Sequence, residues 1–265
     1  KNIYSVITGL GYVFGEDSIK QKILRKFVKI LYKIALNHNN TIFFQNPDDE
    51  QTFLEIGLVN KNQTQVVNGS GVNLETFKPS ETINTNTKPI FLLISRLSWS
   101  KGVGVFVEAA KKIKKIDNQV EFFLLGPLEN IATEININNI EEWETQGILK
   151  YLGSTDDVRP FIKDCSVFVL PSAYREGTPR VILEAMAMGK AIITTDSPGC
   201  KETVVSGENG YLIPVGNSDA LAMAMLEFVK NPAKCNQMGK VSRKIAEEKY
   251  NVFKVNNTML SRMNL

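Results

Sequence analysis

The stretch REGTPRVILEAMAMGKAIITTD, from Arg175 to Asp196, decides the fold of this part of the chain. Its middle is typical of a helix, and AIITTD is typical of a buried strand. Thr178 suits the N-cap position, Pro179 suits the first helical position, and Gly189 can end the helix in the left-handed conformation. The stretch therefore predicts a helix over 179–188 that leads into a strand over 191–196.

The chain on both sides of this stretch repeats the alternation of apolar strands and amphipathic helices. Strands are predicted over 3–8, 41–45, 65–67, 90–95, 120–126, 148–153, 166–172 and 210–214, with helices over 18–36, 47–56, 103–115 and 156–163 and from 218 onward. Such alternation implies a parallel sheet covered on both faces. We predict an α/β fold in which the later part of one Rossmann-like unit is followed by a complete second one.

A polar stretch, SETINTNTKP at residues 80–89, separates the two units because it can contribute little to a core. We therefore expect a partial N-terminal domain over 1–80 and a complete domain over 81–245. A C-terminal helix over 246–265 is expected to pack back on the N-terminal domain. The chain starts without a methionine and directly in a strand, so we expect it to be part of a longer protein.

The composition excludes several classes of protein. Of 265 residues, 43% are hydrophobic and 22% are charged, as in ordinary globular proteins, and the net charge of +3 does not demand a nucleic-acid partner. The three cysteines and one histidine form no metal-binding motif, which predicts no metal site and favours a reduced, cytoplasmic setting. No apolar run reaches the roughly 18–20 residues that a spanning helix needs.

A glycine-containing loop near the start imitates a dinucleotide-binding loop. ITGLGYVFG, residues 7–15, places Gly9, Gly11 and Gly15 between a strand and a helix. Dinucleotide binding also requires an acidic residue at the end of the next strand, which here ends FFQN. We therefore predict a tight strand-to-helix turn.

The helix that follows, SIKQKILRKFVKILYKIAL at 18–36, is strongly basic and contains no acidic residue. The sequence allows two interpretations of this helix. The helix can lie against an anionic bilayer as a basic amphipathic helix, or it can have a solvated basic face over a buried apolar one. Its cations are Lys20, Lys22, Arg25, Lys26, Lys29 and Lys33.

Two glutamates flank the start of the helix at 179–188. Glu176 lies on the loop beyond the carboxyl end of a strand, where open α/β sheets bind ligands, and Glu184 lies inside the helix. Between them the helix N-terminus offers free N–H groups and the positive end of its dipole. This arrangement suits an elongated ligand with hydroxyl groups at both ends and a phosphate between them, as in a nucleotide-sugar.

A second loop at the same sheet edge supplies cations. Arg96 and Lys101, in SRLSWSKG, follow the first strand of the complete unit, and Gly102 opens the next helix. Arginine grips a diphosphate through two hydrogen bonds, and lysine acts as a point charge. Each cation alone is equally typical of a solvated loop, but their shared position with Glu176 favours a diphosphate site.

These segments resemble the C-terminal half of retaining glycosyltransferases of family 4, which have the two-Rossmann GT-B fold. The resemblance rests on SRLSWSKG, on EGTPRVILEAMAMGKAIITTDSPGCKETVVSGENGYLIP and on NGSGVNLETFKP, and it covers nearly the whole chain. Glu176 and Glu184 match the family's pair of glutamates separated by seven residues. EGTPR and PGCKETV resemble a branch that acts on polyprenyl-diphosphate-linked sugars in capsule, O-antigen or protein-glycan assembly.

The resemblance implies a role for each candidate residue. Arg96 and Lys101 would bind the donor diphosphate and stabilise the departing nucleotide, Glu176 would hold the sugar hydroxyls, and Glu184 the ribose hydroxyls. Gly177 and Thr178 would offer backbone N–H groups to the sugar or phosphate. The family needs no metal or other cofactor. The family's glycine-rich acceptor-side loop lies outside this chain, and Thr8 and Gly9 stand where many members have a histidine.

On this basis we expect a hexosyltransferase that moves a sugar, an N-acetylhexosamine, from a UDP-sugar to a lipid-linked or glycan acceptor with retention. It would act in the cytoplasm, peripherally at the inner face of the membrane. The first alternative is another GT-B enzyme of sugar nucleotides, such as an epimerase. The second is a non-catalytic sugar-nucleotide-binding fragment.

Overall fold

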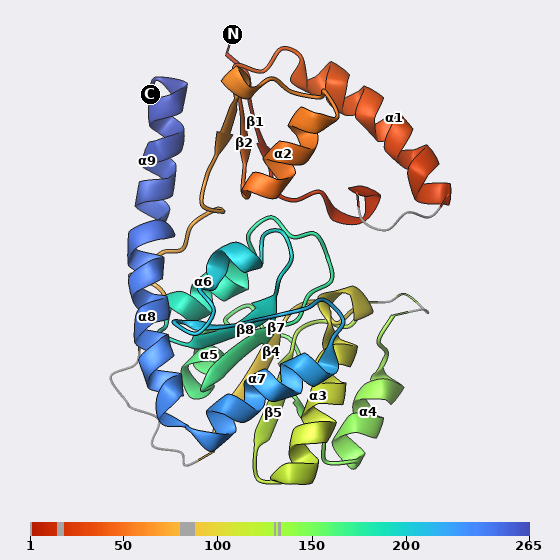
Figure 1. The fold of residues 1–265 in the computed structure, drawn as a ribbon, viewed down its shortest axis with the longest axis vertical. Coiled ribbons are helices and arrows are strands. Elements are labelled where there is room, and N and C mark those ends of the chain that lie inside the picture. Colours follow the sequence, from red (N-terminus) through yellow and green to blue (C-terminus); the bar gives the residue numbers. More distant parts are fainter. Residues whose placement is uncertain (1, 15–18, 80–87, 130, 132–133) are drawn as a thin grey trace.

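The computed structural model describes residues 2–14, 19–79, 88–129, 131 and 134–265 and contains two parallel sheets (Figure 1). The smaller sheet has the order β1-β2-β3, and the larger has the order β6-β5-β4-β7-β8-β9. The predicted α/β fold is confirmed. The strands are β1 (Tyr4–Ile7), β2 (Thr41–Phe44), β3 (Thr64–Val66), β4 (Ile90–Ile94), β5 (Glu121–Leu125), β6 (Lys150–Tyr151), β7 (Val167–Leu170), β8 (Ala191–Thr195) and β9 (Gly210–Ile213).

The larger sheet has the strand order of a dinucleotide-binding unit. Numbered along the chain from β4, its strands follow the order 3-2-1-4-5-6, which reverses direction between β4 and β7. Buried residues alternate between the two faces of β4: Phe91 and Leu93 belong to one apolar core, Leu92 and Ile94 to the other. Helices therefore cover both faces, and ligands of such sheets bind where the order reverses.

The helices are α1 (Ile19–Leu36), α2 (Pro47–Glu55), α3 (Val103–Ile116), α4 (Ile137–Thr145), α5 (Arg159–Asp164), α6 (Arg180–Ala187), α7 (Ser218–Lys230), α8 (Ala233–Lys249) and α9 (Val252–Met263). Helix α4 lies in a segment for which the sequence suggested nothing regular. Its start is fixed by Asn136 and Asn139, whose side chains each bond the other's backbone N–H. Ser18, the expected start of α1, and most of the expected linker at 80–89 lie outside the described residues.

The start of α6 differs from the prediction by one residue. Pro179 occupies the N-cap position, whereas Thr178 donates its hydroxyl hydrogen to the backbone oxygen of Gln45, 2.9 Å away in the N-terminal segment. The predicted N-cap role of Thr178 was therefore wrong, because a bond to another part of the chain uses its side chain. Gly189, with φ of +72°, ends the helix as expected.

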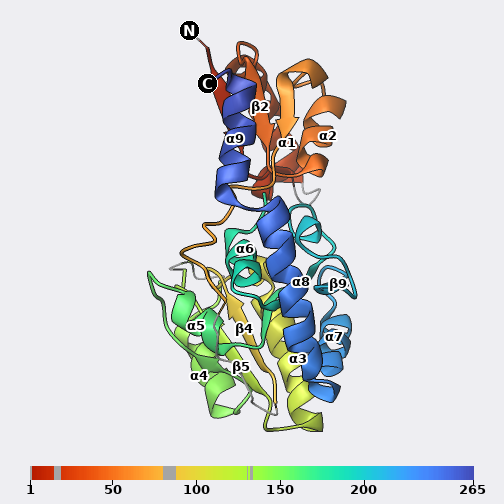
Figure 2. The same ribbon diagram turned by 90° about the vertical axis from the view of Figure 1, so that its left-hand side faces the viewer.

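The last two helices, α8 and α9, connect the two sheets. α8 packs against α6 and β8, whereas α9 continues beyond it and lies along the smaller sheet (Figures 1 and 2). Val255 of α9 is buried with Phe43 and Val67, and the Tyr4 hydroxyl donates to the backbone oxygen of Met263 at 3.1 Å. The C-terminal residues thus hold the N-terminal segment from one side.

Candidate donor-binding site

The loops after β4 and β7 bring two opposite charges together at the point where the strand order reverses. The Lys101 ammonium donates to Glu176 Oε1 at 2.5 Å, and only 14% and 12% of the two side chains are exposed. Ser172 donates a further hydrogen bond to the same oxygen at 3.0 Å. The structure therefore joins two residues that the sequence placed on separate loops.

Backbone contacts fix these two loops against each other. Ser100 accepts hydrogen bonds from the backbone N–H groups of Ala173 and Tyr174, at 2.9 and 3.1 Å. Gly102 has φ of +79°, and a Cβ there would lie 2.0 Å from the backbone oxygen of Pro171. Only glycine fits this conformation and this space, so α3 begins directly beside the loop after β7.

Glu184 lies within α6 and is almost buried. Its carboxylate accepts a hydrogen bond from Arg180 Nε at 3.1 Å, with 11% of the side chain exposed. Burial raises the pKa of Glu184, and the neighbouring Arg180 partly offsets this shift. The Arg180 side chain is 73% exposed and can move away, which leaves the carboxylate able to accept hydrogen bonds from hydroxyl groups.

Arg96 lies at the same sheet edge but does not join the Lys101–Glu176 pair. Its guanidinium bonds Glu129, after β5, at 2.5 Å, and 62% of its side chain is exposed. An exposed ion pair contributes little stability, so Arg96 can exchange this partner for a phosphate at low cost.

Gly177 and Thr178 face the N-terminal segment in this structure. The backbone N–H of Thr178 donates to Gln45 Oε1 at 3.2 Å. A Cβ at Gly177 would lie 2.1 Å from the backbone oxygen of Thr8, at the end of β1. The two N–H groups suggested for a ligand thus lie at the boundary between the two parts of the chain.

Three polar residues beyond the end of β2 bond this loop, and the sequence prediction did not include them: Gln45, Asn46 and Asp49. Asp48, in the same stretch, instead accepts a hydrogen bond from Lys201 after β8. Asp48 and Asp49 also lie in the first turn of α2. A signal was present, because FFQNPDD puts four polar groups beyond the carboxyl end of a buried strand, the edge at which α/β sheets place functional residues.

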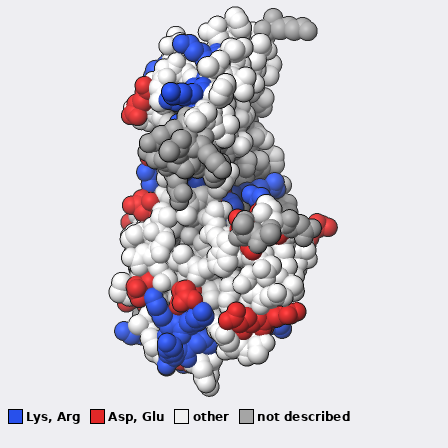
Figure 3. Space-filling view, turned by 90° about the vertical axis from the view of Figure 1, so that its right-hand side faces the viewer, with Lys and Arg blue, Asp and Glu red and all other residues white. Residues whose placement is uncertain are grey.

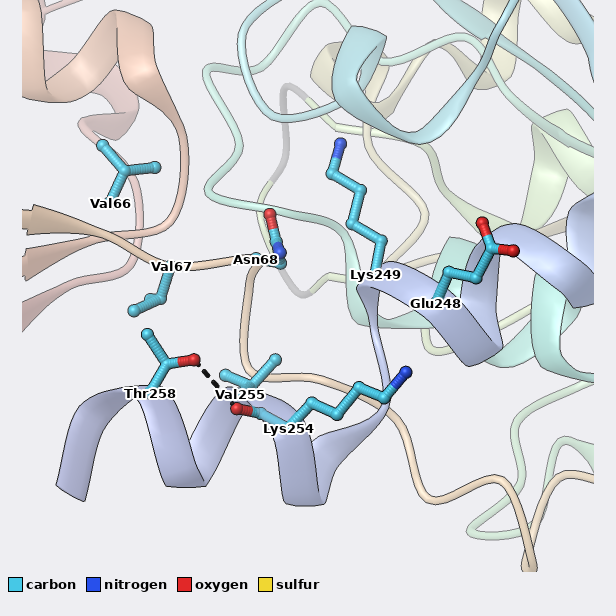
Figure 4. Close-up of a pocket in the computed structure, with 8 residues that line it drawn as sticks. All are labelled: Val66, Val67, Asn68, Glu248, Lys249, Lys254, Val255 and Thr258. Carbon is cyan, nitrogen blue, oxygen red and sulfur yellow. Dashed lines mark hydrogen bonds between the residues drawn. The ribbon is translucent and has the colours of Figure 1, made fainter. Parts of the chain in front are cut away.

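A separate hollow of about 180 Å³ lies between the end of β3 and the junction of α8 with α9 (Figure 4). Val66 and Val67 line one side of it, and Lys249 and Lys254 line the other. Lys249 donates to the backbone oxygen of Glu202 at 2.9 Å, and Lys254 to that of Glu247 at 3.0 Å. Both ammonium groups are thus bonded to backbone oxygens of the chain. The hollow lies where α8 and α9 connect the two sheets.

Within the described part of the chain, no three His, Cys, Asp or Glu side chains lie close enough to hold a metal ion. The three cysteines, Cys165, Cys200 and Cys235, are buried and unpaired. Burial raises the pKa of Cys165 to about 12 and that of Cys200 to about 11, so neither is a ready nucleophile. None of the described helices is both long and apolar enough to cross a membrane.

Comparison with known proteins shows to which family the chain belongs. Residues 75–245 match the model of the glycosyl transferases group 1, and the chain belongs to that family. The chain is 30% identical over 230 residues to the N,N'-diacetylbacillosaminyl-diphospho-undecaprenol alpha-1,3-N-acetylgalactosaminyltransferase of Campylobacter jejuni, covering 83% of this chain and 59% of that protein. It is 28% identical over 194 residues to the putative glycosyltransferase EpsD of Bacillus subtilis, covering 69% and 50%.

Solved structures share the fold. The chain superposes in full on half of TarM with a TM-score of 0.81 at 20% identity. It also superposes in full on 72% of HepE from Anabaena, solved with UDP and glucose, with a TM-score of 0.79 at 19% identity. The GT-B expectation for the fold is thereby confirmed. The chain spans 59% and 50% of the lengths of the two curated relatives named above.

Proposed function

We propose that this chain carries the donor-binding site of a retaining glycosyltransferase of family 4, with a UDP-sugar as donor. The observation that supports this most strongly is the Lys101–Glu176 pair at the point where the strand order reverses. Family membership and the UDP present in the HepE structure agree with it. For the sugar we propose an N-acetylhexosamine, because the Campylobacter relative is named as an N-acetylgalactosaminyltransferase.

In this proposal the residues contact different parts of the donor. Lys101 and Arg96 compensate the charge that develops on the diphosphate as the bond between the sugar and the phosphate breaks. The N-terminus of α6 faces the same charge with its N–H groups. Glu176 accepts hydrogen bonds from the donor sugar, and Glu184 from the ribose. The charge is thus met by side chains and helix ends, so we propose that no metal takes part.

For the acceptor we propose a lipid-linked or glycan sugar, since the Campylobacter relative is named for an undecaprenol-linked substrate. Incubation with UDP-N-acetylhexosamine and an undecaprenyl-diphosphate-linked sugar should yield an elongated glycolipid with the anomeric configuration of the donor. Conversion of the UDP-sugar without acceptor would instead identify an epimerase. Binding of UDP-sugar with no product in either reaction would identify a non-catalytic donor-binding module.

The donor site is tested by calorimetric titration with UDP. Replacing Lys101 with Ala removes a charge-assisted hydrogen bond of about 1.5–3 kcal/mol, so UDP affinity should fall by about 10- to 150-fold. Glu184→Gln should also weaken the binding of UDP. The control is Lys112→Ala, a lysine of α3 that pairs with Asp219 on the surface. Unchanged affinity in both site variants would refute the assignment.

We also propose that α1 binds an anionic membrane surface. Among the side chains of α1 that the structure describes, Val28, Tyr32 and Leu36 pack into the apolar core beneath the helix, whereas a wider apolar stripe points outward. Figure 3 shows Lys and Arg side chains over this part of the molecule. The combination of exposed apolar and basic side chains is typical of interfacial helices. The exposed stripe consists of Ile23, Leu24, Phe27, Ile30, Leu31 and Ile34, between 43% and 68% exposed.

Vesicle sedimentation tests this contact. Phe27→Ser with Leu31→Ser should abolish sedimentation with anionic vesicles, and Lys26→Gln with Lys29→Gln should weaken it and reduce its salt dependence. The control replaces Lys111 and Lys114 with Gln, because these residues belong to the other basic patch of Figure 3, on α3. Equal sedimentation of all variants would refute the membrane contact of α1.

A further inference from the structure

The loop that carries Glu176 is bonded to the N-terminal segment at four consecutive residues. Each of residues 175 to 178 uses a backbone atom for this purpose, so the path of the loop is set from outside its own domain. The bonds run from Gly11 N to the oxygen of Arg175 at 3.3 Å, from Asn46 Nδ2 to the oxygens of Glu176 and Gly177 at 3.3 Å each, and from Thr178 N to Gln45 Oε1 at 3.2 Å.

Asn46 performs two tasks at once. Its side-chain oxygen accepts the backbone N–H of Asp49 at 2.8 Å and so caps α2. Its side-chain nitrogen donates to Asp49 Oδ2 at 3.0 Å and reaches the backbone oxygens of the Glu176 loop. Asn46 is fully buried, so these bonds form away from water. The residue that caps α2 therefore also holds the loop that carries Glu176.

Asp49 adds a charge to the same contact. Its carboxylate is fully buried and pairs with the Arg175 guanidinium at 3.3 Å. Burial raises the pKa of Asp49. Arg175 also donates to Thr52 Oγ1 at 3.4 Å, so it contacts two successive turns of α2. A buried carboxylate at an interface is costly unless a partner compensates it, and the partner here is the residue before Glu176.

The space around the loop is equally restricted. A Cβ at Gly9 would lie 2.7 Å from the nitrogen of Gly177, and one at Gly199 would lie 1.7 Å from its oxygen. The loop is thus layered between the turns after β1 and after β8, with no room for side chains on either side. Gly9 and Gly11 belong to the glycine turn that the sequence predicted after β1, whereas Gly15 lies outside the described residues.

We propose that Asn46 and Asp49 are positioning residues of the donor site: from the N-terminal segment they hold the Glu176 loop in the conformation that recognises the donor sugar. This inference rests on the proposed function for its reference to a sugar. The contacts converge on residues 175–178, whereas Glu184 lies further along α6. The nucleotide end of the site therefore depends on them far less than the sugar end.

The test compares Asp49→Asn and Asn46→Ser with matched controls. Asp49→Asn removes the charge that Arg175 requires, and Asn46→Ser keeps a helix cap while it removes the donor to the loop. Glu50→Gln is the control for the first, because this buried neighbour bonds Lys61 and Thr64 within the N-terminal segment. Asn217→Ser is the control for the second, because Asn217 caps α7.

Two measurements separate positioning from loss of structure. In the ligand-free chain, hydrogen exchange at residues 174–178 should become about 10-fold faster in both variants but not in the controls. Affinity for the UDP-sugar should fall by about 10-fold, while affinity for UDP alone stays within about twofold.

Unchanged exchange at 174–178, or equal losses for UDP and UDP-sugar, would overturn the positioning role. If the unmodified chain binds neither ligand, the proposed function fails. The exchange measurement then decides alone whether Asn46 and Asp49 hold the loop.

Discussion

At the scale of single residues, the central observation is that Glu176 and Lys101 form an ion pair where the strand order of the larger sheet reverses. Both are nearly buried, so each lowers the cost of removing the other from water. In the proposed complex both change partner: Lys101 turns to the diphosphate and Glu176 to the sugar. In this proposal the two side chains have to separate when the donor binds.

This exchange predicts opposite effects of Glu176→Gln on two ligands. The substitution frees Lys101 from a competing carboxylate, so UDP affinity should stay equal or rise. Affinity for the UDP-sugar should fall by about 10-fold, since a charged acceptor of hydroxyl hydrogens is lost. Calorimetry with both ligands measures the difference. A parallel loss for UDP and UDP-sugar would contradict the division of roles.

A second prediction at this scale concerns pH and Glu202, on the loop after β8. Burial raises the pKa of Glu202, the carboxylate of Asp48 raises it further, and Lys201 partly offsets the shift. Because the folded pKa lies above the unfolded one, the free energy of unfolding is highest below the ordinary carboxyl pKa. It falls as pH rises through the raised value.

Glu202→Gln should therefore raise the melting temperature at pH 8 and have little effect at pH 4, with a difference that grows between these limits. Thermal unfolding of both proteins across this range measures it. Glu208→Gln, on an exposed turn nearby, is the control. A difference in melting temperature that does not depend on pH would show that the charge of the Glu202 carboxylate is not its cause.

At the scale of elements, local sequence patterns predicted most helices and strands, because apolar periodicity and caps are local. Helix α4 was missed although Asn136 marks its start. The start of α6 was placed one residue early because Thr178 bonds Gln45 instead of capping the helix. For α1, the pattern predicted an amphipathic helix. It gave no indication that the narrower face, with Val28, Tyr32 and Leu36, is the buried one.

Helix α9 yields a prediction about how the smaller sheet is held. Val255 is buried between Phe43 and Val67, so Val255→Ala should reduce the free energy of unfolding by about 1–3 kcal/mol. Phe253→Ala removes a larger side chain from the same helix, but that side chain is 63% exposed, and it should have little effect. Urea unfolding compares the two. Similar losses would show that α9 does not pack as described.

At the scale of the whole molecule, the proposed donor site is built from both parts of the chain. The sequence predicted the sheet edge and the residues of the larger unit, because strand order and loop position follow from the α/β pattern. It could not predict that Asn46 and Asp49 meet residues 175–178. That contact joins positions about 130 residues apart and depends on how the two sheets dock. Long-range docking is what local patterns do not encode.

The most direct test of the donor-site claim is a crystal structure of the chain with a bound UDP-sugar. The account predicts the diphosphate within hydrogen-bond distance of Lys101 Nζ and beside the first turn of α6. The ribose should lie against Glu184, and the sugar hydroxyls should bond Glu176, which has left Lys101. A nucleotide bound elsewhere, for instance over the lysines of α3, with the Lys101–Glu176 pair intact, would contradict it.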